Sequence, residues 1–188
     1  MKRIAVFASG QGTNAANLIR FFEQSPLARV VWVASNRCNA GVIGLAQSLG
    51  VEATCFPDAA WQSGAVEEQL LKRRIDLIVL AGFLKLVPPG IIKEYENRII
   101  NIHPALLPRF GGKGMYGLNV HKAVQQAREA ETGITVHFVN EQFDEGETIA
   151  QFKIPLTGNE EAKEIEQKVR ALELQHFPEV VRAVIQKL

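Results

Sequence analysis

Cysteine is scarce in this sequence: only Cys38 and Cys55 occur, and they are not arranged as a C-x-x-C pair. Disulfide-stabilised proteins are rich in cysteine, and structural zinc sites need several cysteines or histidines at short spacings. None of the four histidines has the H-x-x-x-H spacing of a metal site either. We therefore expect no disulfide framework and no metal, and we expect the protein to work in the reducing environment of the cytoplasm.

An excess of one charge and a long apolar run are also missing. The chain has 21 basic and 20 acidic side chains, and the basic ones are scattered rather than grouped. Binding of nucleic acid or of an anionic membrane by bulk electrostatics needs concentrated positive charge. A membrane-spanning helix needs about 18 or more apolar residues in a row. We therefore predict a soluble protein that acts on small molecules, with no nucleic-acid or membrane partner, as a monomer or a homodimer.

What the sequence does contain is a regular alternation of short aliphatic runs and helical patterns. No internal repeat or linker interrupts it, so residues 1–188 are expected to form a single domain. Strands are expected at Ile4–Ala8, Val30–Ala34, Val51–Phe56, Leu77–Ala81, Arg98–Ile102, Gly133–Val139 and Thr148–Ile154. Helices are expected at Asn14–Glu23, Val42–Leu49, Val66–Arg74, shortly after Pro88-Pro89-Gly90, at His121–Glu129, and over the last part of the chain, where Pro178 interrupts. This order predicts an α/β fold with a Rossmann-like N-terminal half: a doubly wound, mostly parallel sheet of about seven strands, with ligands beyond their carboxyl ends.

A glycine-rich turn, Gly10-Gln11-Gly12-Thr13-Asn14, follows the first strand and opens the first helix. Backbone N–H groups at such a turn, together with the positive end of the helix dipole, form a site for an anion, usually phosphate. Gly10, Gly12 and Ala15 also fit the looser dinucleotide pattern, but the second strand is followed by Arg37, which suits a 2′-phosphate, rather than by an acid for the ribose. Phosphate binding is the favoured interpretation. The alternative is a tight turn whose glycines only allow close packing.

The tetrapeptide Asn101-Ile102-His103-Pro104 carries the sharper chemical signal. Residues two apart in an extended segment point to the same side, so Asn101 and His103 project together. A carboxamide can donate hydrogen bonds to a developing oxyanion, and an imidazole can accept or donate a proton near neutral pH. Pro104 restricts the backbone of His103 to extended geometry. The alternative is a hydrogen-bonded histidine at a strand end, with Asn101 as a turn former.

Asp144 lies in an acidic turn, Phe143-Asp144-Glu145-Gly146, between two expected strands. A carboxylate brought close to His103 would favour the imidazolium or order a water molecule as a proton relay. The alternative is a solvated turn residue. His137 lies in the middle of a strand and is expected to be a hydrogen-bonded core residue. No G-x-S-x-G nucleophile elbow occurs, so covalent catalysis by a serine triad is not expected.

Taken together, these segments resemble the phosphoribosylglycinamide formyltransferases, folate-dependent enzymes of purine synthesis within the formyltransferase family. The resemblance runs from the first strand to the last helix and rests on Ser9–Asn14, Leu80–Phe83, Asn101–Pro108, Gly133–Val139 and the Asp144 turn. It implies direct attack of the glycinamide ribonucleotide amine on the formyl group of 10-formyltetrahydrofolate, through a tetrahedral intermediate. The folate is a co-substrate in this reaction, and no metal takes part.

The resemblance also implies roles for individual residues. Asn101, His103 and Asp144 would be catalytic. The residues implied in binding the ribonucleotide are Gly12, Thr13, Asn14, Arg170 and Glu173, and those implied in binding the folate are Leu84, Lys85, Leu86, Val87, Asn140, Glu141 and Phe143. Two segments depart from many relatives: no arginine occurs near Gln62-Ser63-Gly64, and the glycine-rich stretch after Gly111 is longer.

Other functions are compatible with parts of the same pattern. A formyltetrahydrofolate deformylase uses water as the acceptor, but it usually has an extra N-terminal domain and tends to lack a proline directly after the catalytic histidine, where this chain has Pro104. A transfer-RNA formyltransferase normally adds a C-terminal domain. A nucleotide-binding module without catalysis would rest on the glycine loop alone. We expect the transferase, with the deformylase as the first alternative.

Overall fold

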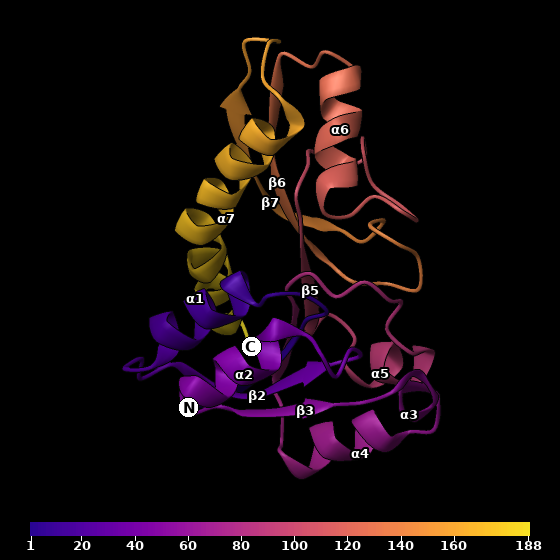
Figure 1. Ribbon diagram of the computed structural model, residues 1–188. Helices are drawn as coiled ribbons and strands as arrows, with labels where there is room; N and C mark the ends of the chain where they lie inside the picture. Colours follow the sequence, from indigo (N-terminus) through magenta and orange to yellow (C-terminus); the bar gives the residue numbers. More distant parts are fainter.

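The computed structural model describes residues 1–188 and contains one seven-stranded sheet, in the order β3-β2-β1-β4-β5-β6-β7 (Figure 1). The strands are β1 (Lys2–Phe7), β2 (Ala28–Ser35), β3 (Glu52–Cys55), β4 (Leu77–Leu80), β5 (Ile99–His103), β6 (Glu131–Phe138) and β7 (Thr148–Pro155). Strands β1 to β5 pair in parallel, whereas β6 runs antiparallel to both β5 and β7. The predicted doubly wound, mostly parallel sheet is confirmed.

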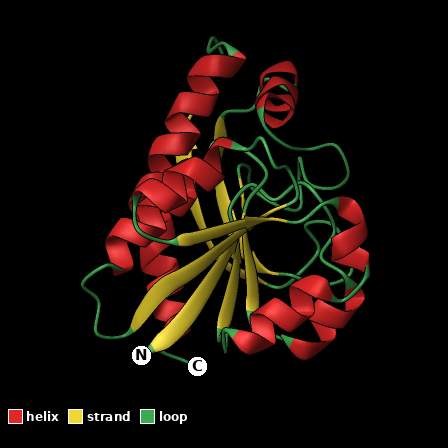
Figure 2. Cartoon of the chain, turned by 60° about the horizontal axis from the view of Figure 1, so that its bottom comes forward, coloured by secondary structure: helices red, strands yellow, loops and turns green.

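Helices cover both faces of this twisted sheet (Figure 2). They are α1 (Thr13–Phe22), α2 (Gly41–Ser48), α3 (Asp58–Gln62), α4 (Ala65–Lys72), α5 (Pro89–Glu94), α6 (Leu118–Gln126) and α7 (Ala162–Ile185). The apolar core on one face includes residues of α1, α2 and α7, and the core on the other face includes residues of α3, α4 and α5. None of the helices is long and apolar enough to cross a membrane.

Strand β1 shows why both faces need a helical cover. Ile4 and Val6 belong to the 28-residue core that includes α1, α2 and α7. Ala5 and Phe7 belong to the 15-residue core on the opposite face. Successive side chains of a strand point to opposite sides, so a strand that is apolar at every position must be buried on both. The buried central strands β1 and β4 can therefore present functional groups only beyond their ends.

Pro178 does not interrupt the last helix, contrary to the sequence-based expectation. Helix α7 continues through it to Ile185. A proline inside a helix removes one backbone hydrogen bond and costs about 3 kcal/mol in an isolated helix. Here Phe177, Pro178 and Val181 are buried in contact with the rest of the protein. Burial of this apolar segment offsets the cost, which the local pattern alone cannot reveal. Helix α3 was also missed, because it is only five residues long.

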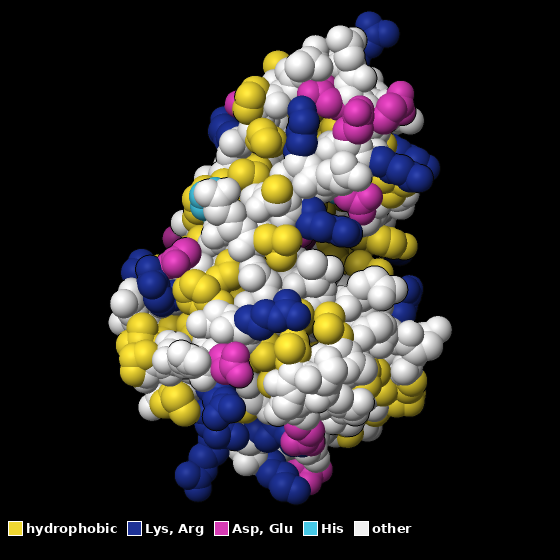
Figure 3. All heavy atoms as spheres, turned by 60° about the vertical axis from the view of Figure 1, so that its left-hand side comes forward, with side chains coloured by type: hydrophobic (Ala, Val, Ile, Leu, Met, Phe, Trp, Pro, Cys, Tyr) yellow, Lys and Arg dark blue, Asp and Glu magenta, His cyan; other side chains and the backbone are white.

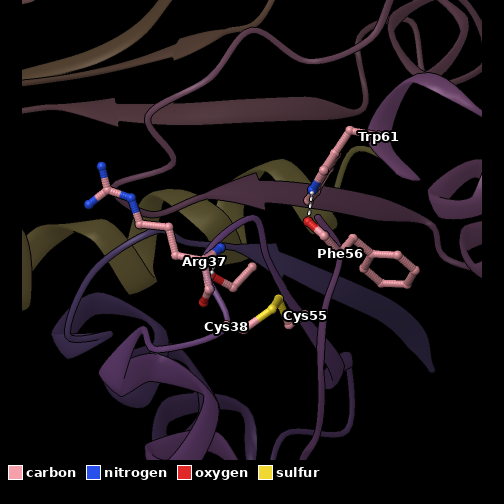
Figure 4. Close-up of a disulfide and its surroundings, with 6 residues drawn as sticks. Arg37, Cys38, Cys55, Phe56 and Trp61 are labelled. Atoms are coloured by element: carbon pink, nitrogen blue, oxygen red, sulfur yellow. Dashed lines mark hydrogen bonds between the residues drawn. A yellow bond between two sulfur atoms is a disulfide. The ribbon is translucent and has the colours of Figure 1, made fainter. Parts of the chain in front are cut away.

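Cys38 and Cys55 form a disulfide, so the expectation that the chain has no disulfide framework was wrong for this pair (Figure 4). Cys55 ends β3, where it pairs with Ser35 of β2, and Cys38 lies in the turn that follows β2. Their Cα atoms are 5.0 Å apart although 17 positions separate them in sequence. The parallel pairing of β2 with β3 brings the two cysteines together, and their spacing along the chain does not indicate this contact.

The surface agrees with the balanced charge of the sequence. Figure 3 shows basic and acidic side chains distributed over the same face of the molecule, together with scattered apolar side chains. Several exposed charges form ion pairs with near neighbours, including Lys153 with Glu131 and Arg182 with Glu179. Exposed pairs of this kind contribute roughly 0–1 kcal/mol each, so packing on the two sheet faces dominates stability.

Candidate active site

A cavity with a volume of about 650 Å³ lies beyond the carboxyl ends of β1, β4 and β5. Its lining includes the predicted catalytic residues Asn101, His103 and Asp144. It also includes every predicted ribonucleotide residue and most of the predicted folate residues: Gly12, Thr13, Asn14, Arg170, Glu173, Leu84, Lys85, Leu86, Val87 and Phe143. Asn140 and Glu141 are not part of this lining. The sequence positions singled out separately thus converge on one space.

The glycine loop is held in place by close contact with the start of α2. Gly12 precedes α1 with a φ of 84°, a left-handed conformation that favours glycine. A Cβ atom at this position would lie 2.5 Å from Cγ2 of Val42. The N–H of Val42 donates to the carbonyl oxygen of Gly10 at 3.1 Å. Both the backbone conformation and the packing therefore require a glycine here, and the loop presents the amino end of α1 to the cavity.

Asn14 and Glu173 connect this loop to the last helix. The Nδ2 group of Asn14 donates to Oε2 of Glu173 at 2.9 Å, across 159 positions of sequence. Burial raises the pKa of Glu173, although the hydrogen bond from Asn14 and the charge of Arg170 act against that shift. The Oδ1 atom of Asn14 is buried and has no hydrogen-bond partner. This corner of the cavity therefore contains an unsatisfied acceptor beside a carboxyl group, which suits a ligand rich in O–H or N–H donors.

Asn101 is oriented by a histidine on the neighbouring strand. Asn101 of β5 lies opposite His137 of β6 in the antiparallel register. Nδ1 of His137 lies 2.7 Å from the carbonyl oxygen of Phe138, which can only accept, so Nδ1 donates and Nε2 is left as an acceptor. Nδ2 of Asn101 donates to that Nε2 at 3.1 Å. Its other hydrogen faces Oδ1 of Asp144 at 3.4 Å, a long contact that a better acceptor can replace.

His103 is buried between a carbonyl group and a carboxylate. Nε2 of His103 donates to the carbonyl oxygen of Phe110 at 2.8 Å, and Nδ1 lies 3.4 Å from Oδ2 of Asp144. Burial lowers the pKa of His103, while Asp144 and the Phe110 carbonyl act to raise it. The neutral imidazole thus has its free lone pair on Nδ1, facing the carboxylate. A proton taken up at Nδ1 would be stabilised by Asp144 at once.

Asp144 has an environment that keeps it ionised. Burial acts to raise its pKa, but the imidazoles of His137 and His103, which pair with the carboxylate when they carry a proton there, and a hydrogen bond from Gly112 outweigh burial and lower the pKa. Oδ1 lies 3.6 Å from Nε2 of His137, and Oδ2 accepts the N–H of Gly112 at 2.9 Å. The φ of Asp144 is 57°, in the left-handed region. Strained backbone of this kind persists where surrounding contacts hold it, and it is common at functional sites.

Comparison with known proteins identifies the family to which this chain belongs. The sequence model of the formyl transferase family ("Formyl transferase") matches residues 2–181. The chain belongs to the formyl transferase family. It is 36% identical over 193 residues to a chloroplastic phosphoribosylglycinamide formyltransferase of Arabidopsis thaliana, a match covering 99% of this chain and 66% of that protein. It is 35% identical over 188 residues to the phosphoribosylglycinamide formyltransferase of Haemophilus influenzae, covering 97% of this chain and 86% of that one.

A solved structure gives the same result for the fold of this formyl transferase. The crystal structure of glycinamide ribonucleotide transformylase 1 from Symbiobacterium toebii matches with a TM-score of 0.90 and 32% sequence identity. The match covers 100% of this chain and 89% of the solved one. The chain spans about two thirds of the plant relative and most of the bacterial ones. The whole sheet and its helices are therefore those of the family.

Some groups in the formyl transferase site were not found by sequence reasoning. His137 was expected only as a core residue, yet it fixes the Asn101 amide. Alternation along β6 does place Thr135 and His137 on one side, but only the antiparallel register places His137 opposite Asn101. The backbone of the loop after Pro108 was missed as well. Its Phe110 carbonyl accepts a hydrogen bond from His103, and its Gly112 N–H donates one to Asp144, two of the residues predicted to be catalytic.

His121 is a further buried histidine of the cavity wall. It lies on α6, is 3% exposed, and its Nδ1 is buried without a hydrogen-bond partner. Burial lowers its pKa, the charge of Glu166 raises it, and His103 and Arg170 lower it further. Side chains placed to hold a metal ion, in a group of three or more His, Cys, Asp or Glu residues, are not found.

Proposed function

We propose that this chain transfers the formyl group of 10-formyltetrahydrofolate to the amine of glycinamide ribonucleotide in purine synthesis. One observation carries the proposal: the glycine loop with Asn14 and Glu173, and the group formed by Asn101, His103 and Asp144, line the same cavity. A formyl transfer to an amine on a phosphorylated sugar needs both parts within one substrate length. The relatives described above carry the same activity in their names.

Asn101 is assigned to the oxygen that acquires negative charge when the amine adds to the formyl carbon. Its amide nitrogen has one N–H on His137 and one directed weakly toward Asp144 at 3.4 Å. The second N–H is available to the oxyanion, because that oxygen is a stronger acceptor at shorter range. Loss of a single donor to an oxyanion typically costs about 3–4 kcal/mol of transition-state stabilisation. His137 keeps the amide from rotating its oxygen toward the reaction.

His103 and Asp144 are assigned to proton transfer. The attacking amine must release a proton, and the departing folate nitrogen must receive one. Nδ1 of His103 lies 3.4 Å from Oδ2 of Asp144, so the imidazolium formed on protonation is paired with a carboxylate. The Phe110 carbonyl fixes the ring through Nε2. No nucleophilic side chain is required, in agreement with the missing nucleophile elbow.

The folate is assigned to the side of the cavity formed after β4. Leu84, Lys85, Leu86 and Val87 follow this strand, and Phe143 approaches from the Asp144 turn. Leu86 lines the cavity and is 47% exposed, so it offers apolar surface to a flat aromatic ring. The bound folate would supply the formyl group. The roles of Asn140 and Glu141 in the same loop stay predictions, because these residues do not line the cavity.

The ribonucleotide is assigned to the other side, against Gly12, Thr13, Asn14, Arg170 and Glu173. The fit is supported by the buried, unpartnered Oδ1 of Asn14, which needs a donor such as a hydroxyl or amine hydrogen. Arg170 lies 3.7 Å from Glu166 and remains exposed, so it can turn toward an anion. A hydrolase that uses water as acceptor has no need of this second subsite. That is the reason to prefer the transferase over the deformylase.

The test is an assay of folate consumption with and without the amine substrate. We expect 10-formyltetrahydrofolate to be consumed only when glycinamide ribonucleotide is present, with one formylated product formed for each folate released. Equal consumption without the amine would establish the deformylase instead. Asn14→Ala provides the matched variant, because it should weaken ribonucleotide binding and leave any hydrolysis unchanged. A cytoplasmic location and a monomeric or homodimeric state stay predictions.

A further inference from the structure

Four basic side chains line the cavity, and they differ in whether their charge is paired. Lys85 forms an ion pair with Asp58, and Arg170 lies 3.7 Å from Glu166. Arg37 and Lys113 line the same cavity and form no salt bridge. An anionic ligand would gain most from these two cations, because no carboxylate has to be displaced first.

The turn that carries Arg37 is anchored to the glycine loop. The hydroxyl of Ser9, the residue before Gly10, donates to Oδ1 of Asn36 at 2.6 Å. Ser35 binds the backbone of Arg37 twice: its hydroxyl accepts the Arg37 N–H and donates to the Arg37 carbonyl, both at 3.1 Å. Ser9 and Ser35 are buried, at 2% and 0% exposure. Two buried hydroxyls therefore fix the backbone of Arg37 beside the loop, while its side chain stays free.

Two more contacts hold this turn from the far side. The carbonyl of Arg37 also accepts the N–H of Ala40 at 3.1 Å, and Val42 then packs on Gly12. The disulfide links Cys38, the next residue, to Cys55 at the end of β3. Figure 4 shows the Arg37 side chain extending away from this bond. The segment from Ser35 to Val42 thus forms a fixed support next to the amino end of α1.

We propose that Arg37 binds the phosphate group of the ribonucleotide, from the β2 side of the glycine loop. The inference rests on the proposed function and adds a residue to it that determines specificity for a phosphorylated substrate. Backbone N–H groups and a helix dipole supply only partial charges, whereas a phosphate monoester carries nearly two negative charges. A free guanidinium supplies a full charge and two parallel donors. Lys113 fits less well, because its neighbour Gly112 is bonded to Asp144, on the catalytic side.

The test compares the substrate with its dephosphorylated form, glycinamide riboside, in three variants. Arg37→Ala should lower kcat/KM for the phosphorylated substrate by about 10- to 100-fold, as expected for a lost charge-assisted hydrogen bond. With the riboside the same variant should differ from the unmodified protein by less than about twofold, since nothing is left for Arg37 to bind. Arg37→Lys should restore part of the loss. Arg29→Ala is the control, since Arg29 is an exposed arginine at the other end of β2 and does not line the cavity.

Each result decides the proposal. An equal loss with both substrates would mean that Arg37 only supports the fold, and no loss with either would mean that the phosphate lies elsewhere. Should the protein not turn over glycinamide ribonucleotide at all, the proposed function fails, and titration with ribose 5-phosphate still tests Arg37. Binding that weakens in Arg37→Ala but not in Arg29→Ala would support the assignment. Equal binding by both variants, or none by the unmodified protein, would overturn it.

Discussion

Replacement of Gly12 by alanine tests the contact that shapes the glycine loop. The φ of 84° places any L-residue in a left-handed conformation, at a cost of about 1–2 kcal/mol. The added Cβ would also meet Cγ2 of Val42 at 2.5 Å and Cβ of Val42 at 2.7 Å. Overpacking of this kind adds about 1–3 kcal/mol. The sum is a loss of about 2–5 kcal/mol in the free energy of unfolding, which lowers Tm by on the order of 10 °C in a protein of this size.

Two other glycines separate these contributions. Gly50 has a φ of 73° with no atom within 4 Å of an added Cβ, so Gly50→Ala isolates the backbone cost. Gly10 has neither a left-handed φ nor a nearby atom, so Gly10→Ala should change stability by less than about 0.5 kcal/mol. The expected order of loss is therefore Gly12→Ala, then Gly50→Ala, then Gly10→Ala. Urea unfolding followed by circular dichroism measures all three.

Kinetics give the second readout for Gly12→Ala. A shifted loop should raise the KM for the ribonucleotide and leave the KM for the folate within about twofold, because the folate residues follow β4 on the other side of the cavity. The structural argument is refuted if Gly12→Ala loses no more stability than Gly50→Ala. The assignment of the loop is refuted if only the KM for the folate rises.

Three further perturbations follow from the same structure. Asp144→Asn removes the carboxylate that lies 3.4 Å from Nδ1 of His103, and its removal lowers the pKa of His103 further. We expect kcat to fall by about 10²–10³-fold with KM values nearly unchanged. An unchanged kcat would exclude a role of Asp144 in proton transfer. Burial lowers the pKa of His103 and of His121 below the ordinary value of 6.5, so the folded protein favours their neutral forms. The stability that this preference contributes is present above pH 6.5 and is lost as the pH falls toward the pKa values of the two histidines in the folded protein. Midpoints of urea unfolding, measured between pH 7.5 and 5.5, report this loss, which should be smaller in His121→Asn. If the midpoint of that variant falls as much with pH as the midpoint of the unmodified protein, His121 does not contribute to the loss. Reduction of the Cys38–Cys55 disulfide opens a loop whose ends are 17 positions apart, and it should lower the free energy of unfolding by about 3 kcal/mol. Thermal unfolding with and without a dithiol reductant measures this loss. If a Cys38→Ser variant still responds to the reductant, the disulfide is not the cause.

Local pattern was sufficient for most of the fold. The short apolar or alternating runs predicted the seven strands of the sheet to within one or two residues. Burial on both faces leaves a continuous aliphatic signature in the central strands β1 and β4. His103 shows the limit at a boundary, since it belongs to β5 rather than following it. The Gly10–Asn14 turn was also predicted correctly as the start of a helix. These features depend on residues that are close together along the chain, so they can be predicted from the sequence.

Contacts between distant segments needed the tertiary structure. The disulfide was missed because it depends on the register of β2 with β3. His137 is the hydrogen-bonded core residue that was expected, but its partner Asn101 is 36 positions away and becomes adjacent only through the antiparallel pairing of β5 with β6. The Phe110 carbonyl has no sequence signature at all, since every residue has one.

The sequence by itself determined the strands, the glycine loop and the residue types of the candidate catalytic group, because side-chain periodicity and backbone preference act over a few positions. Only the tertiary structure decided how those residues work. It set the proton on Nε2 of His103, the orientation of the Asn101 amide and the ionised state of Asp144. Each of these depends on a distance across the sheet or a loop, and hydrogen bonding and burial are fixed by such distances rather than by order along the chain.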